Sequence, residues 1–160
     1  MAKREVERTV QQPLLDRLTD RDPMSATEAR MTHAQSVSEF KQSVRRDVEW
    51  LLNTRRTPEP APDSLGELQD SLYDYGLPDI TSLSADSPEV RMQLARRIEK
   101  AITLFEPRLA DVKISVTDTG EGGSRQLRFL IEGMLRMEPN PEQVAFDTIL
   151  DTTNCNFEVK

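Results

Sequence analysis

Hydrolysis of a glycosidic bond is the chemistry that the acids of this chain could perform. That reaction needs two carboxyl groups flanking the bond, one of them kept protonated in a dry pocket. The chain contains 28 Asp and Glu residues, so pairs of acids arise by chance. Glu106 has the most suggestive neighbours, Phe105 and Pro107, but Arg108 follows closely, and a nearby arginine favours the ionised carboxylate. We therefore expect Glu106 and Arg108 to be structural rather than catalytic.

Residues for nucleophilic catalysis or metal binding are scarce. His33 is the single histidine and Cys155 the single cysteine. A Ser–His or Cys–His pair would have to recruit that one histidine. A lone cysteine forms neither an internal disulfide nor a thiolate cluster around a metal, and a free thiol suits a reducing compartment. The sequence predicts no catalytic residue, no metal site and no cofactor.

A glycine-rich segment at residues 120–123 superficially resembles a phosphate-binding loop. Such a loop follows a strand, opens a helix, and carries a lysine with a Ser or Thr. This segment lies between two alternating patterns and lacks those residues. We predict that residues 118–124 form the loop of a β-hairpin.

Charge and hydropathy restrict the partners. The chain has 160 residues and a formal charge of −7, which argues against a general nucleic-acid binder because phosphate contacts need clustered Lys and Arg. The N-terminus has no apolar run typical of a signal peptide, and no stretch approaches the roughly 20 apolar residues of a membrane-spanning helix. We expect a cytoplasmic protein that binds other proteins and does not insert directly into a membrane.

The elements that would position Glu106 and Arg108 begin after a polar arm. Residues 1–35 have mixed charge and one short apolar cluster, Leu14, Leu15 and Leu18. Such a segment cannot bury a core alone, so we predict a flexible arm. The three leucines are either part of a disordered tail or a docking segment that orders on a partner.

Two long helices are predicted in the remaining domain, residues 36–160. The first spans Ser36–Asn53, with Ser36 and Glu39 as a capping box. The second opens at Ser87-Pro88-Glu89 and stops before Pro107. Both have apolar residues at spacings of three and four, which is typical of helices with one buried face. Between them, Leu65, Leu68 and Leu72 indicate a short helical stretch that ends at Gly76.

After Pro107 the apolar period changes to two, which is typical of half-buried strands. Three runs alternate clearly, and residues Cys155, Phe157 and Val159 suggest a fourth. The three clear runs are Val112–Val116, Leu127–Leu135 and Val144–Leu150. The predicted fold class is α+β, with two main helices followed by a small antiparallel sheet of three to four strands.

Several segments together resemble the TssE family of baseplate subunits of bacterial type VI secretion systems. Their order and spacing carry the resemblance, which spans nearly the whole chain. The segments are LLDRLTDRDP at 14–23, SVRRDVEWLLNTRR at 43–56, YGLPDITSL at 75–83, AITLFEPRL at 101–109, LRFLIEGML at 127–135 and FDTILD at 146–151. The family is similar to the small wedge protein of contractile phage baseplates and shares with it a Glu-Pro-Arg motif, here Glu106, Pro107 and Arg108.

The resemblance implies a structural subunit in a membrane-docked bacterial machine. It implies docking to the TssF–TssG wedge, with TssK nearby, and priming of the contractile TssB–TssC sheath. Glu106, Pro107 and Arg108, together with Leu14, Leu15 and Leu18, are the expected partner-binding residues. The two charged side chains of the motif would bond to neighbouring chains or within the corner itself. The alternative that remains is a lysozyme-like peptidoglycan hydrolase, for which Glu106 would be the acid.

Overall fold

The computed structural model describes residues 9–19, 23–24, 31–59, 61–62, 64–80, 87–117, 126–138 and 140–160. The predicted hairpin loop at 118–124 and residues 81–83 of the YGLPDITSL segment lie outside this part of the chain. The chain divides into two compact units, Met1–Val44 and Arg45–Lys160, and helix α2 (His33–Asn53) contributes to both.

The first unit contains α1 (Leu14–Leu18) and the beginning of α2. The helix α2 starts three residues earlier than predicted, because the capping box is formed by Thr32 and Gln35. The Gln35 amide donates to Thr32 Oγ1 at 3.3 Å, and the Thr32 amide donates to Gln35 Oε1 at 2.9 Å. Ser36 is therefore not the cap. Its buried hydroxyl donates to the His33 carbonyl and accepts from the Val10 amide.

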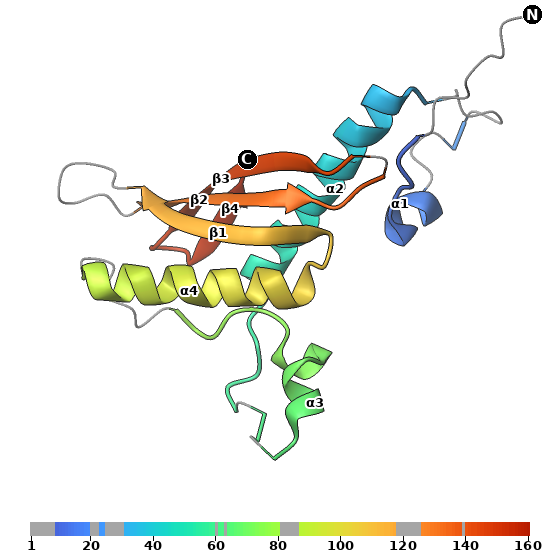
Figure 1. Ribbon diagram of the computed structural model, residues 1–160. Helices are drawn as coiled ribbons and strands as arrows, with labels where there is room; N and C mark the ends of the chain where they lie inside the picture. Colours follow the sequence, from blue (N-terminus) through green and yellow to red (C-terminus); the bar gives the residue numbers. More distant parts are fainter. Residues whose placement is uncertain are drawn as a thin grey trace, which may run out of the picture. The chain divides into compact units, whose positions relative to one another are not determined.

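The second unit is built on a four-stranded antiparallel sheet, which confirms the predicted α+β class. The strands β1 (Leu109–Thr117), β2 (Gln126–Leu135), β3 (Glu142–Asp151) and β4 (Asn156–Val159) pair in their sequence order. The prediction that Cys155 belongs to the fourth strand is wrong, because Cys155 precedes β4 and has a φ of 50°, a turn conformation. Figure 1 shows α4 (Pro88–Phe105) running along one face of the sheet.

Apolar side chains on one face of the sheet and one side of each long helix are buried, as the two periods predict. Ser87 precedes α4 and Pro88 is its first residue, although the Ser87 hydroxyl donates to Glu89 Oε2 at 2.6 Å rather than capping an amide. The fully buried apolar side chains of the second unit are Val48, Leu51, Leu52, Leu77, Ile98, Ile102, Phe129, Ile131, Leu135, Phe157 and Val159.

A β-bulge in β1 keeps its apolar side chains on one face. Leu109 is buried and Val112 half-buried, yet residues three apart on a regular strand point to opposite faces. The register shifts between Ala110 and Lys113, and Asp111 takes a positive φ of 52°. The extra residue of the bulge restores the alternation. Gly133 of β2 leaves room for it, since a Cβ there would lie 3.3 Å from the Ala110 carbonyl oxygen.

The outer edge of the sheet differs between β4 and the first half of β3. Side chains of α2 cover the outer edge of β4: Asn53 exchanges two hydrogen bonds with the Phe157 backbone, Glu49 accepts from the Val159 amide, and Arg45 donates to the Val159 carbonyl. β4 pairs only with the last residues of β3, Thr148–Asp151. The first half of β3 therefore extends beyond the end of β4, and no other strand of the described residues pairs with it on that side.

The segment between the long helices forms two short turns of helix instead of the single predicted stretch. These are α3 (Gly66–Gln69) and the 3₁₀ turn η1 (Leu72–Asp74), and Leu65 and Leu72 are exposed. Gly76 follows with a φ of 104°, which allows the Leu77 amide to donate to the Thr54 carbonyl at 2.9 Å.

Gly76→Ala should destabilise the protein by roughly 2–3 kcal/mol, because a positive φ of this size is strained for any side chain. The added Cβ would also lie 2.4 Å from the Thr54 carbonyl oxygen. Gly66→Ala is the control: a Cβ added there would meet no atom within 4 Å, and alanine is the better helix former by about 1 kcal/mol. Chemical denaturation measures both variants, and equal unfolding free energies would contradict a steric role for Gly76.

Candidate functional site

The Glu-Pro-Arg motif forms a rigid elbow between α4 and β1. The helix ends at Phe105, and the Glu106 amide still donates to the Ile102 carbonyl at 2.8 Å. Pro107 cannot continue the helix, and the Leu109 amide then donates back to the Glu106 carbonyl at 3.1 Å. β1 begins at Leu109. Backbone hydrogen bonds on both sides of Pro107 therefore fix the turn, and Pro107 itself is exposed.

Arg108 folds back onto Glu106 as a bidentate ion pair. Its Nε donates to Glu106 Oε1 at 2.5 Å, and its Nη2 donates to Glu106 Oε2. The Arg108 backbone amide adds a third hydrogen bond to Oε1, at 3.2 Å. Glu106 is only 4% exposed, so its charge has left water and depends on these donors. The sequence left two alternatives for this motif, bonds to neighbouring chains or bonds within the corner. The described residues contain the bond within the corner.

Asp47 of α2 also accepts a hydrogen bond from the Arg108 guanidinium. Arg108 Nη2 donates to Asp47 Oδ2 at 2.7 Å, which joins α2 to the elbow. Asp47 Oδ1 accepts from Arg46, and the Arg46 guanidinium lies 5.0 Å from the centroid of the Trp50 ring. Trp50 is 52% exposed, so it is a surface residue rather than part of the core. Asp47 was not predicted from the sequence; the only signal was its place in the SVRRDVEWLLNTRR segment.

The charges of this cluster affect two pKa values. Burial alone would lower the pKa of Arg108, but its hydrogen bonds to Glu106 and Asp47 outweigh burial and raise that pKa above its ordinary value. Partial burial, followed by the charges of Asp47 and Glu106, raises the pKa of Tyr75. The Tyr75 ring meets Phe105 edge-on, with 5.1 Å between the centroids. The cluster therefore lies near enough to Tyr75 for its carboxylates to disfavour the ionised form of that hydroxyl.

Both oxygens of Glu106 are engaged by Arg108, and Glu106 does not line the cavity that lies against α4. Within the described part of the chain, no cluster of three His, Cys, Asp or Glu residues could hold a metal ion. The described helices also include none that is long and apolar enough to cross a membrane.

The three leucines of the predicted docking segment lie on α1 in the first unit. Leu14, Leu15 and Leu18 are 67%, 48% and 75% exposed. Their segment is helical over five residues, and the Thr19 hydroxyl caps it by donating to the Leu15 carbonyl at 2.9 Å. The leucines belong to a different unit from the elbow.

Glu106→Gln should lower the free energy of unfolding by about 3 kcal/mol, because it leaves the charge of Arg108 without its buried partner. Arg108 keeps 24% of its side chain exposed, which places the expected effect at the lower end of the range for broken buried pairs. Asp47→Asn is the comparison. Its side chain is 25% exposed, so a loss below about 1 kcal/mol is expected. If Glu106→Gln leaves the protein as stable as the wild type in urea unfolding, the structural role of this pair is refuted.

Comparison with known proteins identifies the family. A family model described as "Baseplate wedge protein gp25" matches residues 38–140, well over half of the chain. A search of curated proteins gives no match. One chain of a solved structure, "The baseplate complex from the type VI secretion system", is 22% identical with a TM-score of 0.45, over 68% of this chain and 94% of that chain. On the family match, the chain belongs to the baseplate wedge protein gp25 family.

Proposed function

We propose that this protein is a non-enzymatic structural subunit of a type VI secretion baseplate, on the cytoplasmic side of a membrane-docked machine. The observation that carries the proposal is the gp25 family match across both long helices, the elbow and the first two strands. The ordered TssE-like segments of the sequence support the type VI assignment. The pairing of Glu106 with Arg108 supports a structural role, because a general acid must be available to a substrate.

In this proposal the subunit docks to the TssF–TssG wedge, with TssK nearby, through two surfaces. One comprises the elbow, where Pro107 is exposed and Arg108 is partly exposed, together with the exposed Trp50 of α2. Trp and Arg are the residue types that dominate binding energy in interfaces. The other is the row of exposed leucines on α1, which suits an apolar groove on a partner. An apolar side chain left in water contributes to binding when a partner covers it.

The double substitution Leu15→Ser/Leu18→Ser should reduce co-purification with TssF and TssG while leaving the fold intact. Both side chains are largely exposed, so their loss removes little packing within the protein. Leu65→Ser is the matched control, since Leu65 is 52% exposed in the other unit. Affinity purification with quantitative mass spectrometry measures retention. Normal retention by the double variant would exclude α1 as a docking segment.

Sheath priming is proposed to occur by addition of a strand from a sheath protein to the open part of β3. The Lys160 amide donates to the Asp147 carbonyl, so Asp147 directs its backbone groups toward the β4 side. Backbone direction alternates along a strand, which means that Gln143 and Ala145 direct theirs the same way, beyond the end of β4. Such an edge accepts a strand through backbone hydrogen bonds, so the sequence of the added strand is only weakly restricted.

Ala145→Pro should block sheath priming without unfolding the protein. Proline removes an N–H that makes no bond to β2, because Ala145 and Glu132 form a pair whose backbone groups point away from each other. The expected loss of stability is below about 1 kcal/mol, and Ala145 is exposed. Ala145→Val keeps the N–H and is the control. Electron microscopy of sheaths in complemented cells measures priming, and full-length sheaths with Ala145→Pro would rule out strand addition at this edge.

A further inference from the structure

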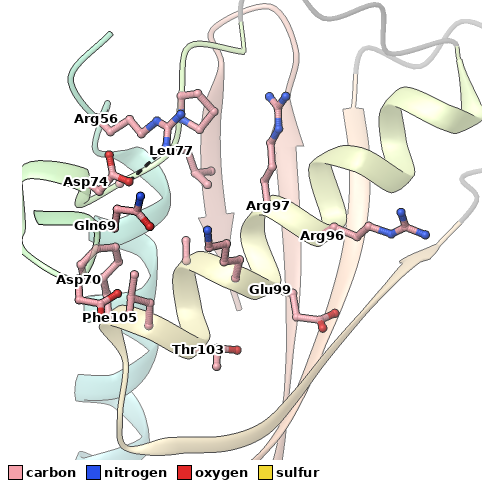
Figure 2. A pocket seen from close by; sticks show the side chains of 15 residues that line it. Arg56, Gln69, Asp70, Asp74, Leu77, Arg96, Arg97, Glu99, Thr103 and Phe105 are labelled. Carbon is pink, nitrogen blue, oxygen red and sulfur yellow. Dashed lines mark ion pairs between the residues drawn. The ribbon is translucent and has the colours of Figure 1, made fainter. Parts of the chain in front are cut away.

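A cavity of about 590 Å³ lies between α4 and the segment that contains α3 and η1 (Figure 2). Its apolar lining includes Leu77, Leu104 and Phe105. Leu77 is buried, while Leu104 and Phe105 are only half-buried and lie at the end of α4. A volume of this size accommodates one or two side chains of a ligand, and the exposed apolar lining would gain from being covered.

The α4 wall of this cavity is basic in a chain of formal charge −7. Arg96, Arg97 and Lys100 line it, and Glu99 is the one acid that α4 contributes to the lining, while Asp70 and Asp74 line the cavity from the other side. Figure 2 shows Arg96 and Arg97 extending from α4 with their guanidinium groups well separated. Arg97 and Lys100 form no ion pair with any residue of the described part of the chain. Two such cations beside an apolar lining favour a ligand that carries carboxylates.

The opposite wall presents an acceptor without a donor. Asp74 Oδ1 is buried and has no hydrogen-bond partner among the described residues. The other oxygen, Oδ2, lies 3.6 Å from Arg56 Nη1, the contact drawn in Figure 2. A buried acceptor left unpaired destabilises a protein unless a bound group donates to it.

We propose that this cavity binds an acidic segment of a neighbouring protein subunit. One apolar side chain of the segment packs on Leu104 and Phe105, and its flanking carboxylates pair with Arg97 and Lys100. Charge complementarity selects this occupant, because a basic segment would meet the cations of α4. The inference rests on the proposed function in one respect only, which is that the partner belongs to the same assembly.

The double charge reversal Arg97→Glu/Lys100→Glu tests the basic wall. Both residues are exposed, so the variant should fold with an unchanged melting temperature while its retention in the complex with TssF, TssG, TssK and the sheath proteins falls about tenfold. Arg128→Glu, on the exposed side of β2, is the control and should be retained normally. Wild-type retention should fall as salt is raised. Equal retention of wild type and double variant would overturn the inference alone, whereas a wild type that is not retained would overturn the proposed function as well.

A photo-crosslinker identifies the occupant directly. A benzophenone amino acid in place of Thr103, an exposed residue of the cavity lining, should crosslink within the assembled complex to one segment of a partner. We expect that segment to carry an apolar residue with an Asp or Glu close to it in sequence. A crosslink to a segment without acids, or an assembled complex without any crosslink between subunits, would exclude an acidic occupant.

Discussion

The structure of the second unit depends on the guanidinium group of Arg108. Arg108 binds the buried carboxylate of Glu106 with two side-chain donors and reaches Asp47 on α2 with one of the same nitrogens. Without these donors the charge of Glu106 would be buried alone, which is among the most unfavourable arrangements in a protein interior. Because the pair sits at the turn between α4 and β1, it adds side-chain hydrogen bonds to a turn that the backbone bonds around Pro107 already fix. The elbow therefore stabilises the fold, and it also positions any docking surface that lies on it.

A second constraint acts at the edge of the sheet. Polar side chains of α2 take up the outward backbone groups of β4, so that edge is closed to strands from other molecules. β4 is shorter than β3, so that no described strand pairs with the outer side of the first half of β3. A protein that closes one part of an edge with specific hydrogen bonds and leaves the next part open controls where a strand can add. This is a physical basis for a subunit that would start a polymer in one register.

Much of the fold could be predicted because it depends on local periodicity. The apolar stripe on α4 and the apolar alternation in β2 and β3 follow from which face of each element is buried. The end of α4 follows from Pro107, which cannot continue a helix. Errors occurred where two local signals competed. Ser36 and Thr32 are both good caps, and the helix uses Thr32 because Ser36 is needed to bind the Val10 amide. The bulge at Asp111 escaped prediction because its sequence reads as an ordinary strand.

The sequence by itself determined the element types and the antiparallel α+β class, since both follow from residue type and short-range spacing, and its family resemblance singled out Glu106, Pro107 and Arg108. Only the tertiary structure decided which groups those residues bind. Asp47 lies 61 residues from Arg108, and Asn53 lies 104 residues from Phe157. Contacts across such separations leave no periodic pattern in the sequence, because they arise only when packing of the apolar faces brings α2, the elbow and β4 together.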